Sequence, residues 1–155
     1  MVAVPDFRDA TLGLKGDVTY GPADGVTPST AAADRALSIG YRATLTIDTT
    51  DPDSGTPRTL TLKDPVIGGG DLTITGGGKV VLAAAGNRVG KLTLAGGTLS
   101  VSGDCNGWTE ILSADAVVGL ADHLDGALAC KLEENVDGTV TLLIRRRLGT
   151  MLLLR

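Results

Sequence analysis

The fold of this chain is decided by residues 68–82, which read Gly-Gly-Gly-Asp-Leu-Thr-Ile-Thr-Gly-Gly-Gly-Lys-Val-Val-Leu. Aliphatic residues alternate there with threonine, which places one face of a strand in a core and the other in water. The glycine triplets interrupt the alternation, because glycine adopts tight corners at little steric cost. The stretch therefore predicts two short strands that are separated by a glycine corner.

The same pattern recurs on both sides of this stretch at a nearly constant spacing. The insertion Thr49–Gly55 is polar, and without its seven residues the 27-residue step from Leu45 to Leu72 also becomes 20. Two interleaved series of strands therefore share one period. Neighbours in each series are 19 or 20 residues apart: Leu60, Val80 and Leu99 in one, and Leu72, Leu92 and Leu112 in the other.

A shared period near 20 residues, with short strands and glycine corners, predicts an all-β solenoid. Stacked turns bury a continuous aliphatic column that no single turn could bury alone. The composition agrees with a narrow aliphatic core, since 43% of residues are hydrophobic and only 3% are aromatic. An antiparallel β-sandwich is the alternative, but it does not explain why two strand series keep the same period.

The 155 residues are expected to form one domain with three parts. Residues 1–41 are predicted to be an N-terminal cap segment, with a short strand at Val18–Tyr20 and a capped helical turn between Thr27 and Leu37. Residues 42–112 are the predicted solenoid turns. Residues 113–155 are the terminal turns and a closing β-hairpin.

Two signals locate strands in the terminal part. Asp137-Gly138 is a hairpin signal between the expected strands at 128–132 and 139–144. A last strand is expected at Met151–Leu154. The run Arg145-Arg146-Arg147 is interpreted as an edge guard, because charge discourages further strand pairing, and anion binding is the alternative.

Residues 68–103 resemble the autotransporter-associated β-strand repeat, a glycine-rich strand–turn–strand unit that closes on Gly-Gly-Thr-Leu-x-Val, here Gly96–Val101. The tail is similar to the usual end of such passenger proteins, where Thr-Glu-Ile-Leu-Ser-Ala (Thr109–Ala114) precedes a strand, an Asp-Gly turn and a strand. The chain shows one or two clear copies of the repeat rather than many. The resemblance implies a right-handed parallel β-helix in a secreted or cell-surface bacterial protein.

Charge and hydropathy exclude several classes of partner. The formal net charge is −4 and the isoelectric point is about 4.8, which argues against nucleic acid as a partner. No stretch approaches the roughly 20 apolar residues of a membrane helix, so we expect no membrane insertion. Met1–Asp6 lack the basic start and apolar run of a secretory signal, and we expect any export signal to lie upstream. The expected location is extracellular or at the cell surface.

No catalytic or metal-binding arrangement is visible, so we expect no enzyme activity, no metal and no cofactor. His123 is the single histidine, and a surface loop explains it better than acid–base catalysis. Asp48, Asp51 and Asp53 are oxygen ligands that calcium accepts, but a solvated turn is the favoured interpretation.

The aromatic and cysteine residues supply the remaining candidates. Trp108 and Tyr41 are candidate platforms for stacking a sugar, with a core or end-cap role as the alternative for Trp108. Cys105 and Cys130 are interpreted as small buried hydrophobes, and a disulfide is the alternative if they fall on neighbouring turns.

The sequence therefore predicts a non-catalytic structural or adhesive module whose partner is a glycan or a host surface, with a homo-oligomer left open. Two alternatives remain at this point. One is a polysaccharide-binding or lyase-like β-helix domain. The other is part of a phage tail or appendage fibre.

Overall fold

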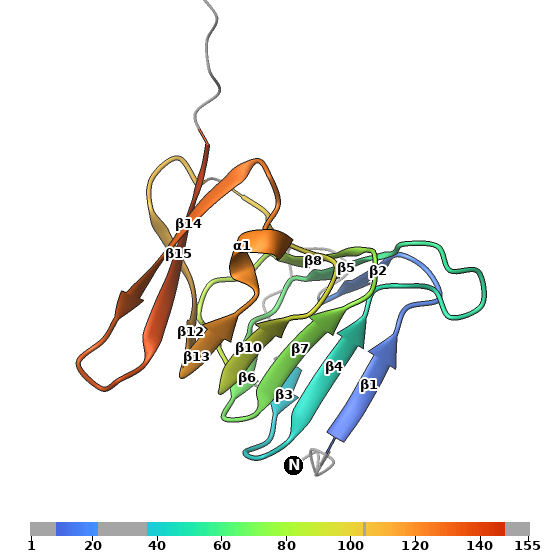
Figure 1. The fold of residues 1–155 in the computed structure, drawn as a ribbon, viewed down its shortest axis with the longest axis horizontal. Coiled ribbons are helices and arrows are strands. Elements are labelled where there is room, and N and C mark those ends of the chain that lie inside the picture. The colour runs from blue at the N-terminus through green and yellow to red at the C-terminus, as the bar shows by residue number, and fades with distance from the viewer. Residues whose placement is uncertain (1–8, 22–36, 104, 148–155) are drawn as a thin grey trace, which may run out of the picture.

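The computed structural model describes residues 9–21, 37–103 and 105–147 (Figure 1). The protein is all-β with largely parallel sheets, and its described part holds one short helix, α1 (Leu120–His123). The strands are β1 (Asp9–Gly13), β2 (Val18–Tyr20), β3 (Leu37–Ile39), β4 (Thr44–Asp48), β5 (Thr59–Leu62), β6 (Val66–Gly68), β7 (Asp71–Thr75), β8 (Lys79–Leu82), β9 (Asn87–Arg88), β10 (Lys91–Leu94), β11 (Thr98–Val101), β12 (Thr109–Ala114), β13 (Ala116–Val118), β14 (Leu128–Glu134) and β15 (Val140–Arg146).

Strands that lie three places apart in the chain pair with one another in parallel. The largest sheet has the order β1-β4-β7-β10-β13, and a second has the order β11-β8-β5-β2. A third, two-stranded sheet joins β3 to β6, and β9 pairs in parallel with β12. The stacking of β1, β4, β7, β10 and β13 is visible in Figure 1. This parallel pairing is the reverse of what an antiparallel β-sandwich requires, so that alternative was wrong.

The register of these pairs stacks like on like. Leu45 pairs with Leu72, and Leu72 pairs with Leu92. In the second sheet Leu60 pairs with Val80, and Val80 with Leu99. All but Leu45 are at most 1% exposed, and Leu45 packs against the same core. The predicted period is therefore the spacing at which aliphatic side chains meet across neighbouring strands, which lie about 4.8 Å apart.

The structure confirms one part of the predicted spacing and contradicts another. The polar insertion is confirmed as a loop between β4 and β5 that extends away from the sheets (Figure 1). The pairing of Leu92 with Leu112 was wrong, because Leu92 pairs with Val117. Residues 102–108 form a longer connection than the matching residues 83–86, and this extra length delays the next strand.

The N-terminal part is less separate than expected. The strand at Val18–Tyr20 is confirmed as β2, which pairs with β5, and β1 pairs along its whole length with β4. These strands extend the sheets, so the part of residues 1–41 that the structure describes is a continuation of the sheets. The helical turn predicted between Thr27 and Leu37 lies outside the described residues, except that Leu37 begins β3.

The hairpin predicted at Asp137-Gly138 is confirmed. β14 and β15 pair antiparallel across the Asp137-Gly138 turn, where Gly138 has a φ of 84°. β15 also pairs antiparallel with β12, which completes a mixed sheet in the order β14-β15-β12-β9. The strand expected at Met151–Leu154 lies outside the described residues.

A buried asparagine connects three segments of backbone. Asn87 in β9 is 3% exposed. Its Oδ1 accepts a hydrogen bond from the Val66 N–H at 2.9 Å, and its Nδ2 donates to the carbonyls of Ala84 at 2.7 Å and Ile111 at 2.9 Å. Short strands leave some backbone groups without a sheet partner, and the amide supplies the missing partners.

Candidate ligand-binding surface

Trp108 lies at the outer face of the mixed sheet, next to the start of β12. In a sheet, residues directly opposite each other share a face. Leu143 is opposite both Lys131 and Glu110, so these three side chains form one row across the sheet. The inner face of β15 carries Leu142 and Ile144, which are fully buried in the core.

Two cations lie over the indole ring of Trp108. The Arg145 guanidinium carbon lies 4.7 Å from the ring centroid, and Lys131 Nζ lies 5.0 Å from it. These distances fit cation–π contacts. The Trp108 side chain remains 39% exposed, so the alternative of a core or end-cap plug was wrong.

The charges on this face are unevenly paired. Lys131 Nζ contacts Glu133 Oε1 at 2.6 Å. Within the described parts of the chain, no carboxylate lies in ion-pair range of Arg145. Because β15 lies between β14 and β12, Arg145 is in the middle of the sheet, and its interpretation as an edge guard was wrong.

Tyr41 is more exposed and has a simpler environment. It lies in the turn between β3 and β4, with 77% of its surface exposed. Arg42 lies 5.4 Å from its ring centroid and has a φ of 66°. Tyr41 lies beside Gly69, which follows β6, whereas Trp108 precedes β12. The structure therefore does not combine the two aromatic candidates in one site.

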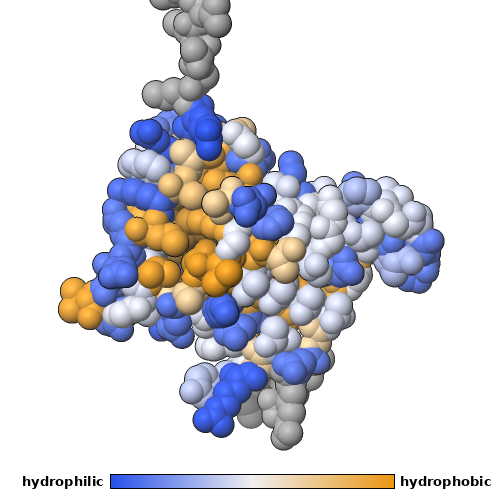
Figure 2. All heavy atoms as spheres, viewed as in Figure 1, coloured by the Kyte–Doolittle hydropathy of each residue, from blue (hydrophilic) through white to orange (hydrophobic). Residues whose placement is uncertain are grey.

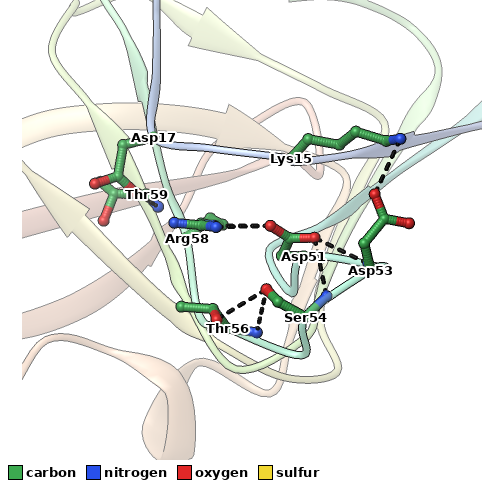
Figure 3. A network of polar contacts seen from close by, with 8 residues as sticks. All are labelled: Lys15, Asp17, Asp51, Asp53, Ser54, Thr56, Arg58 and Thr59. Carbon is green, nitrogen blue, oxygen red and sulfur yellow. Dashed lines mark hydrogen bonds and ion pairs between the residues drawn. The ribbon is translucent and has the colours of Figure 1, made fainter.

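The acidic loop is organised by one carboxylate (Figure 3). Asp51 Oδ2 contacts Arg58 Nη2 at 2.7 Å, and its Oδ1 accepts from the backbone N–H groups of Asp53 and Ser54. The ion pair with Arg58, together with these hydrogen bonds, lowers the pKa of Asp51 to about 2. Asp51 is only 5% exposed, so the interpretation as a solvated turn was wrong for this residue.

The other two acids of this loop have separate partners. Asp53 pairs with Lys15 at 3.1 Å, and Asp48 Oδ1 accepts from the Thr50 N–H at 2.9 Å. The three carboxylates do not converge on a common point. No cluster of three or more metal-ligating side chains occurs within residues 9–21, 37–103 and 105–147.

His123 is half-buried in α1, and the interpretation as a surface loop residue was wrong. Its Nδ1 lies 3.0 Å from the carbonyl oxygen of Gly97, so this nitrogen is the donor. Asp125, two residues later, accepts from the Ala127 N–H and from the hydroxyl of Ser100, which together lower its pKa. The carboxylate is thus held by other partners, and the histidine is engaged with backbone.

Both cysteines are free thiols. Cys105 is buried, which agrees with the interpretation as a small hydrophobe, and Cys130 is half-buried. Burial raises the pKa of the Cys130 thiol, while the nearby charge of Arg147 lowers it. The alternative disulfide is not formed in this structure.

Sequence reasoning singled out Trp108 and the run that contains Arg145, but it missed Lys131 and the contact of both cations with the ring. Lys131 and Arg145 follow it by 23 and 37 residues, and only the pairing of β14 and β15 with β12 brings all three together. Comparisons with family models, with curated proteins and with solved structures found no match to this chain. In the described part of the chain, no helix is long and apolar enough to cross a membrane.

Proposed function

We propose that this chain is a non-catalytic structural and adhesive module of a secreted or cell-surface bacterial protein, built as a right-handed parallel β-helix. The observation that carries the proposal is the strand order, in which most strands from β1 to β10 pair in parallel with the strand three places later. A chain that advances along an axis in this way builds a rigid body from short, local repeats.

The aliphatic rows support this architecture. Ile47, Ile74 and Leu94 occupy successive strands of one sheet and are each at most 3% exposed. Leu62, Leu82 and Val101 repeat the arrangement in a second sheet. Such rows form a narrow core that needs few aromatic residues, as the composition predicts. The resemblance to the autotransporter-associated repeat supports the same architecture and location.

The loop 49–58 supports a display role, because the sheets accommodate this insertion. The loop 49–58 carries its own internal support, because Asp51 binds Arg58 and a bridge joins Thr50 to Pro57. It interrupts the period without disturbing the register of β4 on β7 or of β5 on β8. A scaffold of this kind holds variable loops on an invariant core.

The location is tested on cells that express the native gene. An antibody raised against the chain should label intact cells or detect the chain in the culture medium. Protease added outside should remove the cell-bound signal while a cytoplasmic marker protein remains. Labelling that appears only after lysis, with nothing in the medium, would refute the proposed location and role.

A further inference from the structure

We propose that the outer face of the β12–β15–β14 sheet binds a linear acidic polysaccharide, with Trp108 as the stacking platform and Arg145 and Lys131 as the anion-binding groups. The inference rests on the proposed adhesive function, because it names the surface and the class of ligand. It is carried by an exposed indole ring that has two cations within 5.0 Å of its centroid.

The charge of this patch is opposite to that of the whole protein. The chain carries a net charge of −4, yet the groups around the ring are cationic. Arg145 lacks a carboxylate partner among the described residues, and its guanidinium is left available for a carboxylate or a sulfate. Lys131 is shared with Glu133, and a ligand anion would compete for it.

The backbone around the patch favours a sugar polymer over a peptide. Extended peptides commonly bind by adding a strand at a free sheet edge. Here β15 is paired on both sides, and β12 is paired with both β15 and β9. Recognition at Arg145 is therefore limited to its side chain, whereas β14, which carries Lys131, lies at the edge of the sheet, and poly-glutamate tests whether a peptide binds there. An indole ring packs well against the apolar face of a pyranose, and the cations select sugars that carry a negative charge.

The layout of charged side chains suits a ligand that runs across the strands. Arg88 lies opposite Ser113, and Ser113 lies opposite Thr141, so Arg88 shares the outer face with Lys131 and Arg145. Neighbouring strands are about 4.8 Å apart, and these cations lie on three strands of the four-stranded sheet, β9, β14 and β15. A polymer with an anion on successive sugars meets several cations at once, whereas a single sugar meets one.

Glu110 supplies an internal check, because it lies in the same row as Lys131 and forms no ion pair with the described residues. A carboxylate at this point repels an anionic ligand. Glu110→Gln should therefore tighten binding about threefold, while Asp53→Asn, which removes an exposed carboxylate from the loop 49–58, should not. The expected change corresponds to about 0.7 kcal/mol.

The experiment is a titration of the full chain with polygalacturonate, heparin, neutral dextran and poly-glutamate at about 50 mM salt. Binding is expected for polygalacturonate or heparin, which separates a ligand with carboxylates alone from one that also carries sulfates, and not for dextran. Trp108→Ala and Arg145→Ala should each weaken binding at least tenfold, or about 1.4 kcal/mol. Raising the salt to about 500 mM should weaken binding further, because exposed charges are screened.

Two matched controls change other parts of the structure. Tyr41→Ala removes an exposed aromatic ring, and Lys91→Ala removes an exposed cation. Both should bind within twofold of the parent chain. Trp108→Phe should retain more binding than Trp108→Ala, and thermal melts should show that all variants are folded.

Three results would overturn the assignment. These are equal binding of dextran, equal or tighter binding of poly-glutamate, and binding that persists in both Trp108→Ala and Arg145→Ala. Failure to bind either acidic polysaccharide would also overturn it. Surface labelling of cells tests the proposed function separately. If the cells are labelled but no polysaccharide binds, only the proposed ligand is refuted.

Discussion

Replacing Asn87 with alanine should be among the most damaging single substitutions in this protein. Its amide makes three hydrogen bonds, to Val66, Ala84 and Ile111, in a site from which water is excluded. Alanine leaves one backbone N–H and two carbonyls without these partners. Each buried group left unsatisfied costs about 1–3 kcal/mol.

The expected loss in the free energy of unfolding is about 3–6 kcal/mol, taking the lower half of that range for three groups. A domain of this size is stable by only about 5–15 kcal/mol, so the variant should be close to unfolding at 37 °C. Urea denaturation followed by far-UV circular dichroism measures this loss, with the slope of the transition compared between variants.

Asn87→Asp tests the same buried amide through the pH dependence of stability. The substitution replaces the donor Nδ2 with an oxygen that faces the carbonyls of Ala84 and Ile111. Burial and these oxygens should raise the folded-state pKa of the new carboxyl above its unfolded value of about 3.9. The variant should therefore be most stable below about pH 4 and lose stability as the pH rises through the folded-state pKa.

Asn135→Ala is the matched control, because this asparagine is exposed and its side-chain amide donates to the hydroxyls of Thr139 and Thr141. It should cost less than about 1 kcal/mol. If Asn87→Ala costs no more than Asn135→Ala, or if Asn87→Asp gains stability as the pH rises from 4 to 7, the buried amide does not have the role described.

Three further predictions follow from the loop, a glycine corner and the thiols. The pKa of Asp51 is lowered to about 2 in the folded protein, so its contribution to stability is present above its unfolded-state pKa of 3.8 and is lost as the pH falls toward 2. Asp51→Asn should therefore remove this part of the acid dependence of stability, which thermal melts at several pH values measure. Gly78→Ala should destabilise the fold by more than about 1 kcal/mol, since its Cβ would lie 2.0 Å from a backbone oxygen, whereas Gly77→Ala, whose nearest neighbour would be 3.7 Å away, should change urea stability by less than about 0.5 kcal/mol. Iodoacetamide should alkylate Cys130 before Cys105 in the native protein, because Cys105 is the more buried thiol. Both thiols should react after unfolding without reductant, and failure of both to react then would show a disulfide.

The strands were largely predictable, because alternation is a local property of the chain. Thr-Leu-Thr-Ile and similar runs place every second side chain in the core whichever strand lies beside them. The pairing of Leu60 with Val80 and of Leu72 with Leu92 was also predictable, since a constant period repeats the same geometry. The corner at residues 76–78 was recognisable because only glycine fits so close to neighbouring atoms at Gly76 and Gly78.

The errors lie where the period ends. The longer connection at 102–108 moves the next strand, so Leu92 meets Val117. Asp51 was assigned to solvent because aspartate usually is, but its partner Arg58 folds back over it from the far end of the loop. Loop length and loop closure depend on contacts outside the repeating pattern, and no local rule contains them.

The sequence by itself determined which residues face the core and how far apart matching strands lie, because both depend on side-chain alternation and glycine placement along the chain. Only the tertiary structure decided that Lys131 and Arg145 meet the ring of Trp108. That meeting requires β15 to reverse direction and pair between β14 and β12. Long-range antiparallel register is set by the packing of Leu142 and Ile144 into the core, and spacing in the sequence carries no trace of it.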